Sequence, residues 1–176
     1  MENLPISAAV RRLTPADKKQ FDEAGYLQAL PIFDQGAARQ LQKRLHELEA
    51  LMPSDVPISS VNMWHKANRW IYDLARTPAI LDYVEDLIGP DVLCWGASFF
   101  AKKAHDPRYV SWHTDSFFYG FEPADSLTAW LAFNPSTEQS GCVKYIPGSH
   151  KSATVHDIMP DADNLLPMAQ NAKDVP

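Results

Sequence analysis

The sequence contains little cysteine and little basic charge, and each shortage excludes a class of protein. Cys94 and Cys142 are its two cysteines; they lie far apart and form no CxxC pair, which argues against a disulfide framework or a zinc knuckle and favours reduced thiols. Sixteen lysines and arginines stand against 22 acidic residues, for a net charge of −6. We therefore expect neither a nucleic acid nor an anionic membrane as a partner.

Long apolar runs are also missing near the start of the chain. Residues 1–10 are interrupted by Glu2 and Pro5 and lead into Arg11 and Arg12, a pattern unlike a signal peptide or a membrane span. From this we expect a soluble, cytoplasmic protein. The pattern gives no indication of an oligomeric state.

The residues that are present are typical of a globular protein. Hydrophobic residues make up 45% and charged residues 22% of the 176 positions. This length is enough for one domain that buries roughly 70% of its unfolded surface. We treat residues 1–176 as a single domain.

Residues 1–90 are predicted to be mainly helical. Thr14, Pro15 and Asp17 form a helix start and Gly25 a stop, which predicts a helix over residues 14–24. Asp34 can cap a second helix, and a short third helix is expected around Trp70. The second helix carries an apolar stripe of Leu41, Leu45, Leu48 and Met52.

A fourth helix is predicted to start at Thr77-Pro78 and to end at Gly89-Pro90. Its expected inward side chains are Ile80, Leu81, Val84, Leu87 and Ile88.

From residue 91 the hydrophobic pattern changes its period. Residues 92–101, 109–113, 126–134 and 141–147 are strand candidates separated by polar or Gly/Pro loops, and residues 151–176 are expected to be a loop. Helices followed by short strands predict a mixed α/β (α+β) fold, with N-terminal helices packed on a jelly roll. Four or five strands are fewer than a jelly roll needs, so we expect a C-terminally incomplete domain with core strands over 91–150.

The segment Trp112-His113-Thr114-Asp115 holds the candidate metal ligands. In a strand, His113 and Asp115 point to the same face, so an imidazole nitrogen and a carboxylate oxygen can reach one metal ion. With a third ligand from another strand they would complete the 2-His-1-carboxylate face of a non-haem Fe(II) site. The alternative is an exposed histidine and aspartate at a strand end, which the spacing alone does not exclude.

Four sequence blocks in order place this segment in a wider context: Trp112 to Ser116, Leu127 to Ala132, Gly141-Cys142, and Ile146 to Lys151 with the sequence IPGSHK. Together with residues 78–91 they resemble the phytanoyl-CoA dioxygenase family of Fe(II)- and 2-oxoglutarate-dependent oxygenases. The resemblance implies a double-stranded β-helix (a cupin-like jelly roll) with N-terminal helices. It also implies Fe(II) as cofactor, with 2-oxoglutarate and O2 as co-substrates.

Residue by residue, the resemblance makes His113 and Asp115 the proximal pair of iron ligands. It places Trp130 in the 2-oxoglutarate site, although a core tryptophan is the alternative. Phe99 and Asn62 fall at or near co-substrate contacts, but packing and loop roles are at least as plausible for them. The family's distal histidine and its 2-oxoglutarate-binding arginine have no counterpart here.

Two later histidines fit a metal site poorly. His150 belongs to a Pro-Gly turn and is expected to be structural, and His156 follows it too soon to be the distal ligand. We therefore expect the 176-residue chain alone to bind iron weakly and to be inactive.

The resemblance implies an enzyme that hydroxylates a small molecule and releases succinate and CO2. Asp115 occupies the position where halogenating relatives carry a small residue, which favours hydroxylation. The alternative from a different class is a noncatalytic cupin-like binding or interaction domain, or an inactive fragment.

Overall fold

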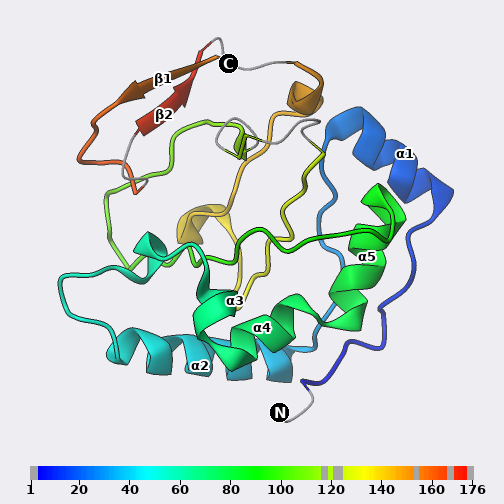
Figure 1. Ribbon diagram of the computed structural model, residues 1–176, viewed down its shortest axis with the longest axis horizontal. Coiled ribbons are helices and arrows are strands. Elements are labelled where there is room, and N and C mark those ends of the chain that lie inside the picture. Colours follow the sequence, from blue (N-terminus) through cyan, green and yellow to red (C-terminus); the bar gives the residue numbers. More distant parts are fainter. Residues whose placement is uncertain (1–3, 116–118, 121–124, 153–154, 166–168, 174–176) are drawn as a thin grey trace.

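The computed structural model describes residues 4–115, 119–120, 125–152, 155–165 and 169–173. In Figure 1 a small hairpin lies at the end of the molecule opposite the long helix α2 (Gln35–Ala50). The described elements are α1 (Pro15–Ala24), α2 (Gln35–Ala50), η1 (Ile58–Ser60), α3 (Trp64–Ala67), α4 (Arg69–Ala75), α5 (Pro78–Ile88), η3 (Glu138–Ser140), η4 (Ser149–Lys151), β1 (His156–Met159) and β2 (Ala169–Ala172).

The starts of α1 and α2 are set by side-chain caps, as predicted. The Thr14 hydroxyl accepts from the backbone N–H of Asp17, and the Asp17 carboxylate accepts from the N–H of Thr14, which is a complete capping box. Asp34 caps α2 by accepting from the N–H of Ala37. Gly25 ends α1 with a φ of 83°, a left-handed conformation that costs glycine little.

Helix α5 begins and ends where the sequence predicted, but its buried face differs. Ile80 is buried as expected, whereas Ile88, the last residue of the helix, is 43% exposed. Ala79 and Tyr83 are buried in addition, and the Tyr83 hydroxyl donates to the carbonyl of Pro31. That hydrogen bond satisfies the polar end of a buried ring, which explains how a tyrosine can occupy the inner face.

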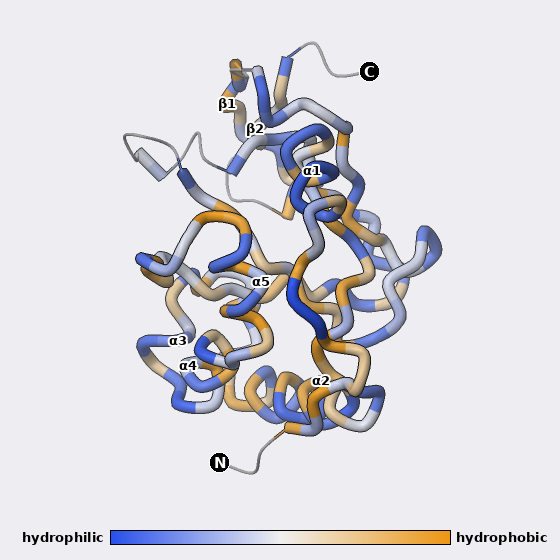
Figure 2. Tube along the Cα trace, turned by 90° about the vertical axis from the view of Figure 1, so that its right-hand side faces the viewer, coloured by the Kyte–Doolittle hydropathy of each residue, from blue (hydrophilic) through white to orange (hydrophobic). Residues whose placement is uncertain are grey.

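Two hydrophobic clusters join the helices to the rest of the chain. In the first, Leu48, Ile58, Trp64 and Ile71 are buried, and Leu45 and Met52 of the predicted stripe pack against them. In the second, Leu41 contacts Leu74 and Ile80, and Leu41 is only 1% exposed. The apolar stretches of α2 in Figure 2 therefore lie in the core, as the helical spacing predicted.

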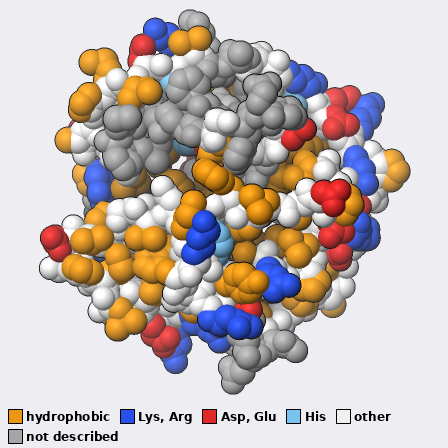
Figure 3. Space-filling view, in the orientation of Figure 1, with side chains coloured by type: hydrophobic (Ala, Val, Ile, Leu, Met, Phe, Trp, Pro, Cys, Tyr) orange, Lys and Arg blue, Asp and Glu red, His pale blue; other side chains and the backbone are white. Residues whose placement is uncertain are grey.

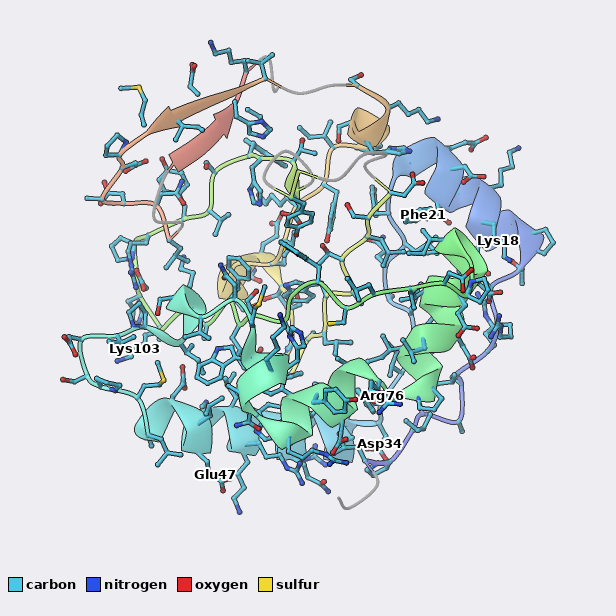
Figure 4. The ribbon with its side chains drawn as sticks, viewed as in Figure 1. Lys18, Phe21, Asp34, Glu47, Arg76 and Lys103 are labelled. Atoms are coloured by element: carbon cyan, nitrogen blue, oxygen red, sulfur yellow. The ribbon has the colours of Figure 1, made fainter. Side chains whose placement is uncertain are left out.

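Charged contacts fasten α1 and the segment before it to α5. The Asp86 carboxylate accepts from the backbone N–H of Leu13 at 2.9 Å and also receives Arg12 and Lys18. Lys18 lies where α1 meets α5 in Figure 4. The hydrogen bond from Leu13 is the largest cause of a lowered Asp86 pKa, and the two cations add to it.

Residues 91–150 were predicted to form jelly-roll strands, but the described part of this segment contains no β-strand. Isolated bridges join Met63 to Ala97 and Tyr109 to Asn164. Large apolar side chains are exposed along this region, including Leu93 at 84% and Phe100 at 53%, and Figure 3 shows apolar side chains gathered over the middle of one face. The double-stranded β-helix therefore stays a prediction.

The segment expected to be a loop, residues 151–176, contains a hairpin instead. Strands β1 and β2 pair antiparallel, with His156 opposite Ala172 and Met159 opposite Ala169. The polar composition of this segment hid the pairing, because its few apolar residues do not alternate over a strand's length. Among the described residues, no helix is both long and apolar enough to cross a bilayer.

Candidate metal-binding site

The structure brings His113 and Asp115 together. The His113 Nε2 and Asp115 Oδ1 atoms are 3.0 Å apart, and the side chains are 21% and 47% exposed. Two ligand atoms that each lie about 2.1 Å from one metal ion, at 90° to one another, are separated by about 3.0 Å. The pair therefore has the separation that adjacent positions of an octahedral ion require.

The imidazole of His113 is held in the orientation that a metal ligand needs. Its Nδ1–H donates to the carbonyl of Ser111 at 2.8 Å, since a carbonyl oxygen can only accept. This bond keeps a proton on Nδ1, so Nε2 is the nitrogen that faces Asp115 and binds either a proton or a metal ion. The site thus includes the second hydrogen bond that metal-ligating histidines usually make.

The electrostatics of the pair favour a positive charge between the two groups. The hydrogen bond from His113 is the largest cause of a lowered Asp115 pKa, and Thr128 adds to it. The same hydrogen bond raises the pKa of His113, against the opposing effect of burial. A proton on Nε2 or a metal ion can supply that charge, and the two compete for the same lone pair.

Three residues around Asp115 carry roles that the sequence did not predict. The Thr128 hydroxyl donates to Oδ2 of Asp115 at 3.0 Å, which leaves Oδ1 to face His113. The Tyr119 hydroxyl also donates to Asp115, and the charge of Asp115 adds to the burial that raises the pKa of Tyr145. In the strand predicted over residues 126–134, Thr128 and Trp130 are two positions apart and would share a face, and this alternation is the signal that could have identified Thr128.

The remaining predicted co-substrate contacts are less closely placed. Trp130 is 44% exposed and lies two positions beyond Thr128. The Phe99 ring packs among aromatic rings, 5.9 Å from Trp70 and 6.2 Å from Phe133 between centroids, which supports the packing role. Asn62 is exposed, and its carbonyl accepts from the N–H of Ala97.

Several other expectations can be placed on the structure. The sequence also offers five aromatic residues for the wall of a substrate pocket: Trp64, Phe117, Phe118, Tyr119 and Phe121. Phe117, Phe118 and Phe121 lie outside the described residues, Trp64 is buried in the first hydrophobic cluster, and Tyr119 contacts Asp115.

Lys102, Lys103 and Arg108 form a small basic patch in the sequence, for which a role in attracting an anionic substrate or a plain solvated surface are the alternatives. Arg108 is paired with Asp106 at 2.6 Å, and Lys103 is exposed at the edge of the molecule in Figure 4, which supports the solvated surface. In the part of the chain that is described, no cluster of three or more His, Cys, Asp or Glu side chains could hold a metal ion.

A hollow of about 440 Å³ lies elsewhere, over α3 and α4. It is lined by residues 65–69 and Tyr72, and neither His113 nor Asp115 lines it. Both cysteines are free thiols in the structure.

Comparison with known proteins identifies the relatives of this chain. The sequence model of the family described as Phytanoyl-CoA dioxygenase (PhyH) matches residues 21–173, which is most of the chain. The chain belongs to the phytanoyl-CoA dioxygenase family. The resemblance stated from the sequence blocks is therefore confirmed.

Individual members of the phytanoyl-CoA dioxygenase family are distant. Human peroxisomal phytanoyl-CoA dioxygenase is 28% identical over 110 residues, covering 60% of this chain and 32% of that protein. L-proline trans-4-hydroxylase from Streptomyces griseoviridis is 22% identical over 151 residues, covering 80% of this chain and 56% of that protein. A phytanoyl-CoA dioxygenase domain-containing protein 1 homolog from Caenorhabditis briggsae is 41% identical over 49 residues, covering 27% of this chain and 17% of that protein.

The chain spans about a third of the length of the first of these relatives. No solved structure matches it significantly. The relatives are dioxygenases and hydroxylases, so the family is one of oxygenase-type enzymes.

Proposed function

We propose that this protein is an Fe(II)- and 2-oxoglutarate-dependent dioxygenase that hydroxylates a small molecule and releases succinate and CO2. The observation that carries the proposal is the 3.0 Å approach of His113 Nε2 to Asp115 Oδ1 in a chain of the phytanoyl-CoA dioxygenase family. A proline hydroxylase among the relatives supports hydroxylation of a small molecule as the reaction class. The carboxylate at position 115 agrees with it.

His113 and Asp115 would hold the iron. Bound there, Fe(II) would supply the oxidising chemistry together with dioxygen and 2-oxoglutarate. The chain's own part is to present two ligand atoms without rearrangement. Ser111 fixes the imidazole through its Nδ1–H, and Thr128 holds the carboxylate oxygen that does not face His113.

Proton movement at His113 accompanies metal binding in this proposal. Without a cation, Nε2 and Asp115 Oδ1 attract one another through a proton on Nε2, which is why the pKa of His113 is raised. To hold a metal ion through Nε2, His113 would give up that proton to solvent. The Nδ1 proton stays on the ring, since its carbonyl acceptor is unchanged.

The co-substrate contacts extend the same proposal. Trp130 would line the 2-oxoglutarate site beside Asp115, because Thr128, two residues earlier, already touches that carboxylate. Asn62 and Phe99 are proposed as co-substrate contacts on the resemblance to the family. For Phe99 the aromatic packing described above gives a structural role as well.

The proposal concerns the whole protein, so it is tested by anaerobic titration of the extended reading frame with Fe(II) and 2-oxoglutarate, followed by exposure to oxygen; the 176-residue chain alone is expected to give neither signal. We expect a visible charge-transfer band on titration and succinate release on oxygenation. His113→Ala and Asp115→Ala should abolish both signals. His46→Ala, which changes an exposed histidine on α2, should leave both unchanged.

The same titration separates the enzyme from the alternative of a noncatalytic cupin-like domain. The observation that favours this alternative is that the described part of the chain contains no cluster of three or more metal-ligating side chains. A protein that gives neither the band nor succinate contradicts the oxygenase proposal and favours the noncatalytic one. A band that His113→Ala leaves in place contradicts our placement of the iron.

A further inference from the structure

A segment that comes late in the sequence runs along the ligand-bearing segment. We call residues 155–165 and 169–173 the C-terminal arm. The backbone N–H of Tyr109 donates to the carbonyl of Asp163, and the N–H of Leu165 donates to the carbonyl of Tyr109. The N–H of Ala172 donates to the carbonyl of Trp112, next to His113, at 2.8 Å. Backbone hydrogen bonds therefore join the arm to the residues that lead to His113 and Asp115.

A buried side chain of the arm contacts the backbone of Thr114, the residue between the two proposed ligands in the sequence. His156 is 7% exposed, and its Nε2 accepts from the backbone N–H of Thr114 at 2.9 Å. Because Nε2 is the acceptor, this nitrogen carries no proton. The same lone pair cannot bind a metal, which separates His156 from the ligands.

The amide that His156 holds is well placed to control the geometry of the pair. It belongs to the peptide group between His113 and Thr114, and Asp115 follows directly. The backbone dihedral angles on either side of this amide set how the His113 and Asp115 side chains approach one another. A fixed Thr114 amide thus limits rotation of the backbone that carries both ligand side chains.

We propose that His156 is a positioning residue, whose imidazole holds the Thr114 amide and so keeps the His113 and Asp115 side chains convergent on one cation. The inference rests on the proposed function, because it assigns a role at the same site. Groups that orient metal ligands typically change metal affinity by about 10–100-fold when they are removed. We expect an effect of that size here.

The test compares two substitutions of His156 by Mn(II) binding, measured from the electron paramagnetic resonance signal of the free ion. His156→Leu removes the acceptor and keeps an apolar side chain in the buried position. His156→Gln keeps an oxygen acceptor on a side chain of similar reach. We expect about a tenfold or greater loss of Mn(II) affinity in His156→Leu and recovery of most of it in His156→Gln.

Asn164→Ala is the matched control for a merely structural role. Asn164 is 6% exposed and donates to the Ser111 hydroxyl at 2.8 Å, so it joins the same two segments away from Thr114. We expect it to lower the melting temperature as His156→Leu does but to keep Mn(II) affinity within about twofold of the parent protein. Equal losses of affinity in both variants would overturn the proposal, since the arm as a whole would then be responsible.

A second measurement needs no metal. In protein labelled with nitrogen-15, a scalar coupling between the Thr114 amide nitrogen and His156 Nε2 should be visible by nuclear magnetic resonance, since it passes through the hydrogen bond. A folded protein without this coupling refutes the positioning role. If the coupling is present but the parent protein binds no Mn(II), the proposed function has failed, and the positioning role falls with it.

Discussion

Thr128→Val tests how far the metal pair depends on a supporting hydroxyl. The substitution keeps the branched shape of the side chain and removes the donor that lies 3.0 Å from Asp115 Oδ2. Without that donor the carboxylate can turn, and either oxygen can face His113. Metal binding should weaken, because the ligand atom is no longer held in one place.

The structure gives the size of the effect. A hydrogen bond to a charged group contributes about 1.5–3 kcal/mol, which corresponds to roughly 12- to 150-fold in an equilibrium constant. The Asp115 side chain is 47% exposed, so water screens the interaction and the lower end applies. We expect Mn(II) affinity to fall about tenfold.

Calorimetric titration of Mn(II) into the parent protein and Thr128→Val measures this ratio directly. Thr128→Ser is the control, since it keeps the hydroxyl and should bind within about twofold of the parent. Affinity in Thr128→Val within twofold of the parent would refute the reasoning, because the Thr128 bond would then not orient the ligand. A loss in Thr128→Ser as large as in Thr128→Val would point to packing instead.

Three further predictions concern stability. Leu41→Ala should lower the free energy of unfolding by about 2–5 kcal/mol in urea denaturation, because Leu41 is 1% exposed, while Leu51→Ala, at 82% exposure, should change it by less than about 0.5 kcal/mol. Gly25→Ala should lower the melting temperature, since Gly25 has a φ of 83° and an added Cβ would overlap the His150 ring. In the double variant, His150→Ala should restore part of that loss. If the two single-variant losses simply add in the double variant, the overlap is contradicted. Asp86→Asn should lower the melting temperature near neutral pH and make the melting temperature fall less steeply in acid. The reason is that the pKa of Asp86 is lower in the folded protein than in the unfolded chain, so the ionised carboxylate stabilises the fold above the unfolded pKa, and this stabilisation is lost as the pH falls through the folded pKa. Asp91→Asn, at an exposed position, should behave as the parent protein.

The helices could be predicted from the sequence because their signals are local. Thr14, Asp34 and Gly25 cap helices within four residues of their own positions, so no distant partner is needed. The prediction for α5 was wrong at Ile88 and missed Tyr83, which is buried through a bond to Pro31, 52 residues earlier. Such a long-range contact leaves no trace in helical periodicity.

The candidate site divides in the same way. His113 and Asp115 are two residues apart, so the sequence alone could suggest that their side chains meet, and the structure places their Nε2 and Oδ1 atoms 3.0 Å apart. Thr128 and His156 reach the pair from 13 and 42 residues away in sequence, so their roles depend on how distant segments pair. The predicted strands of 91–150 also depend on distant partners, and the jelly roll therefore stays a prediction.

The bond between His156 and Thr114 also bears on how the protein is made. A ribosome adds roughly 5–20 residues per second, so His156 is synthesised about 2–8 s after Thr114, which precedes it by 42 residues. During that interval the nascent chain already carries both ligands but not yet the imidazole that restrains the peptide between them. Under the proposed function, stable uptake of iron should therefore follow completion of the C-terminal arm, and ribosome-bound chains that stop before residue 155 should retain metal poorly.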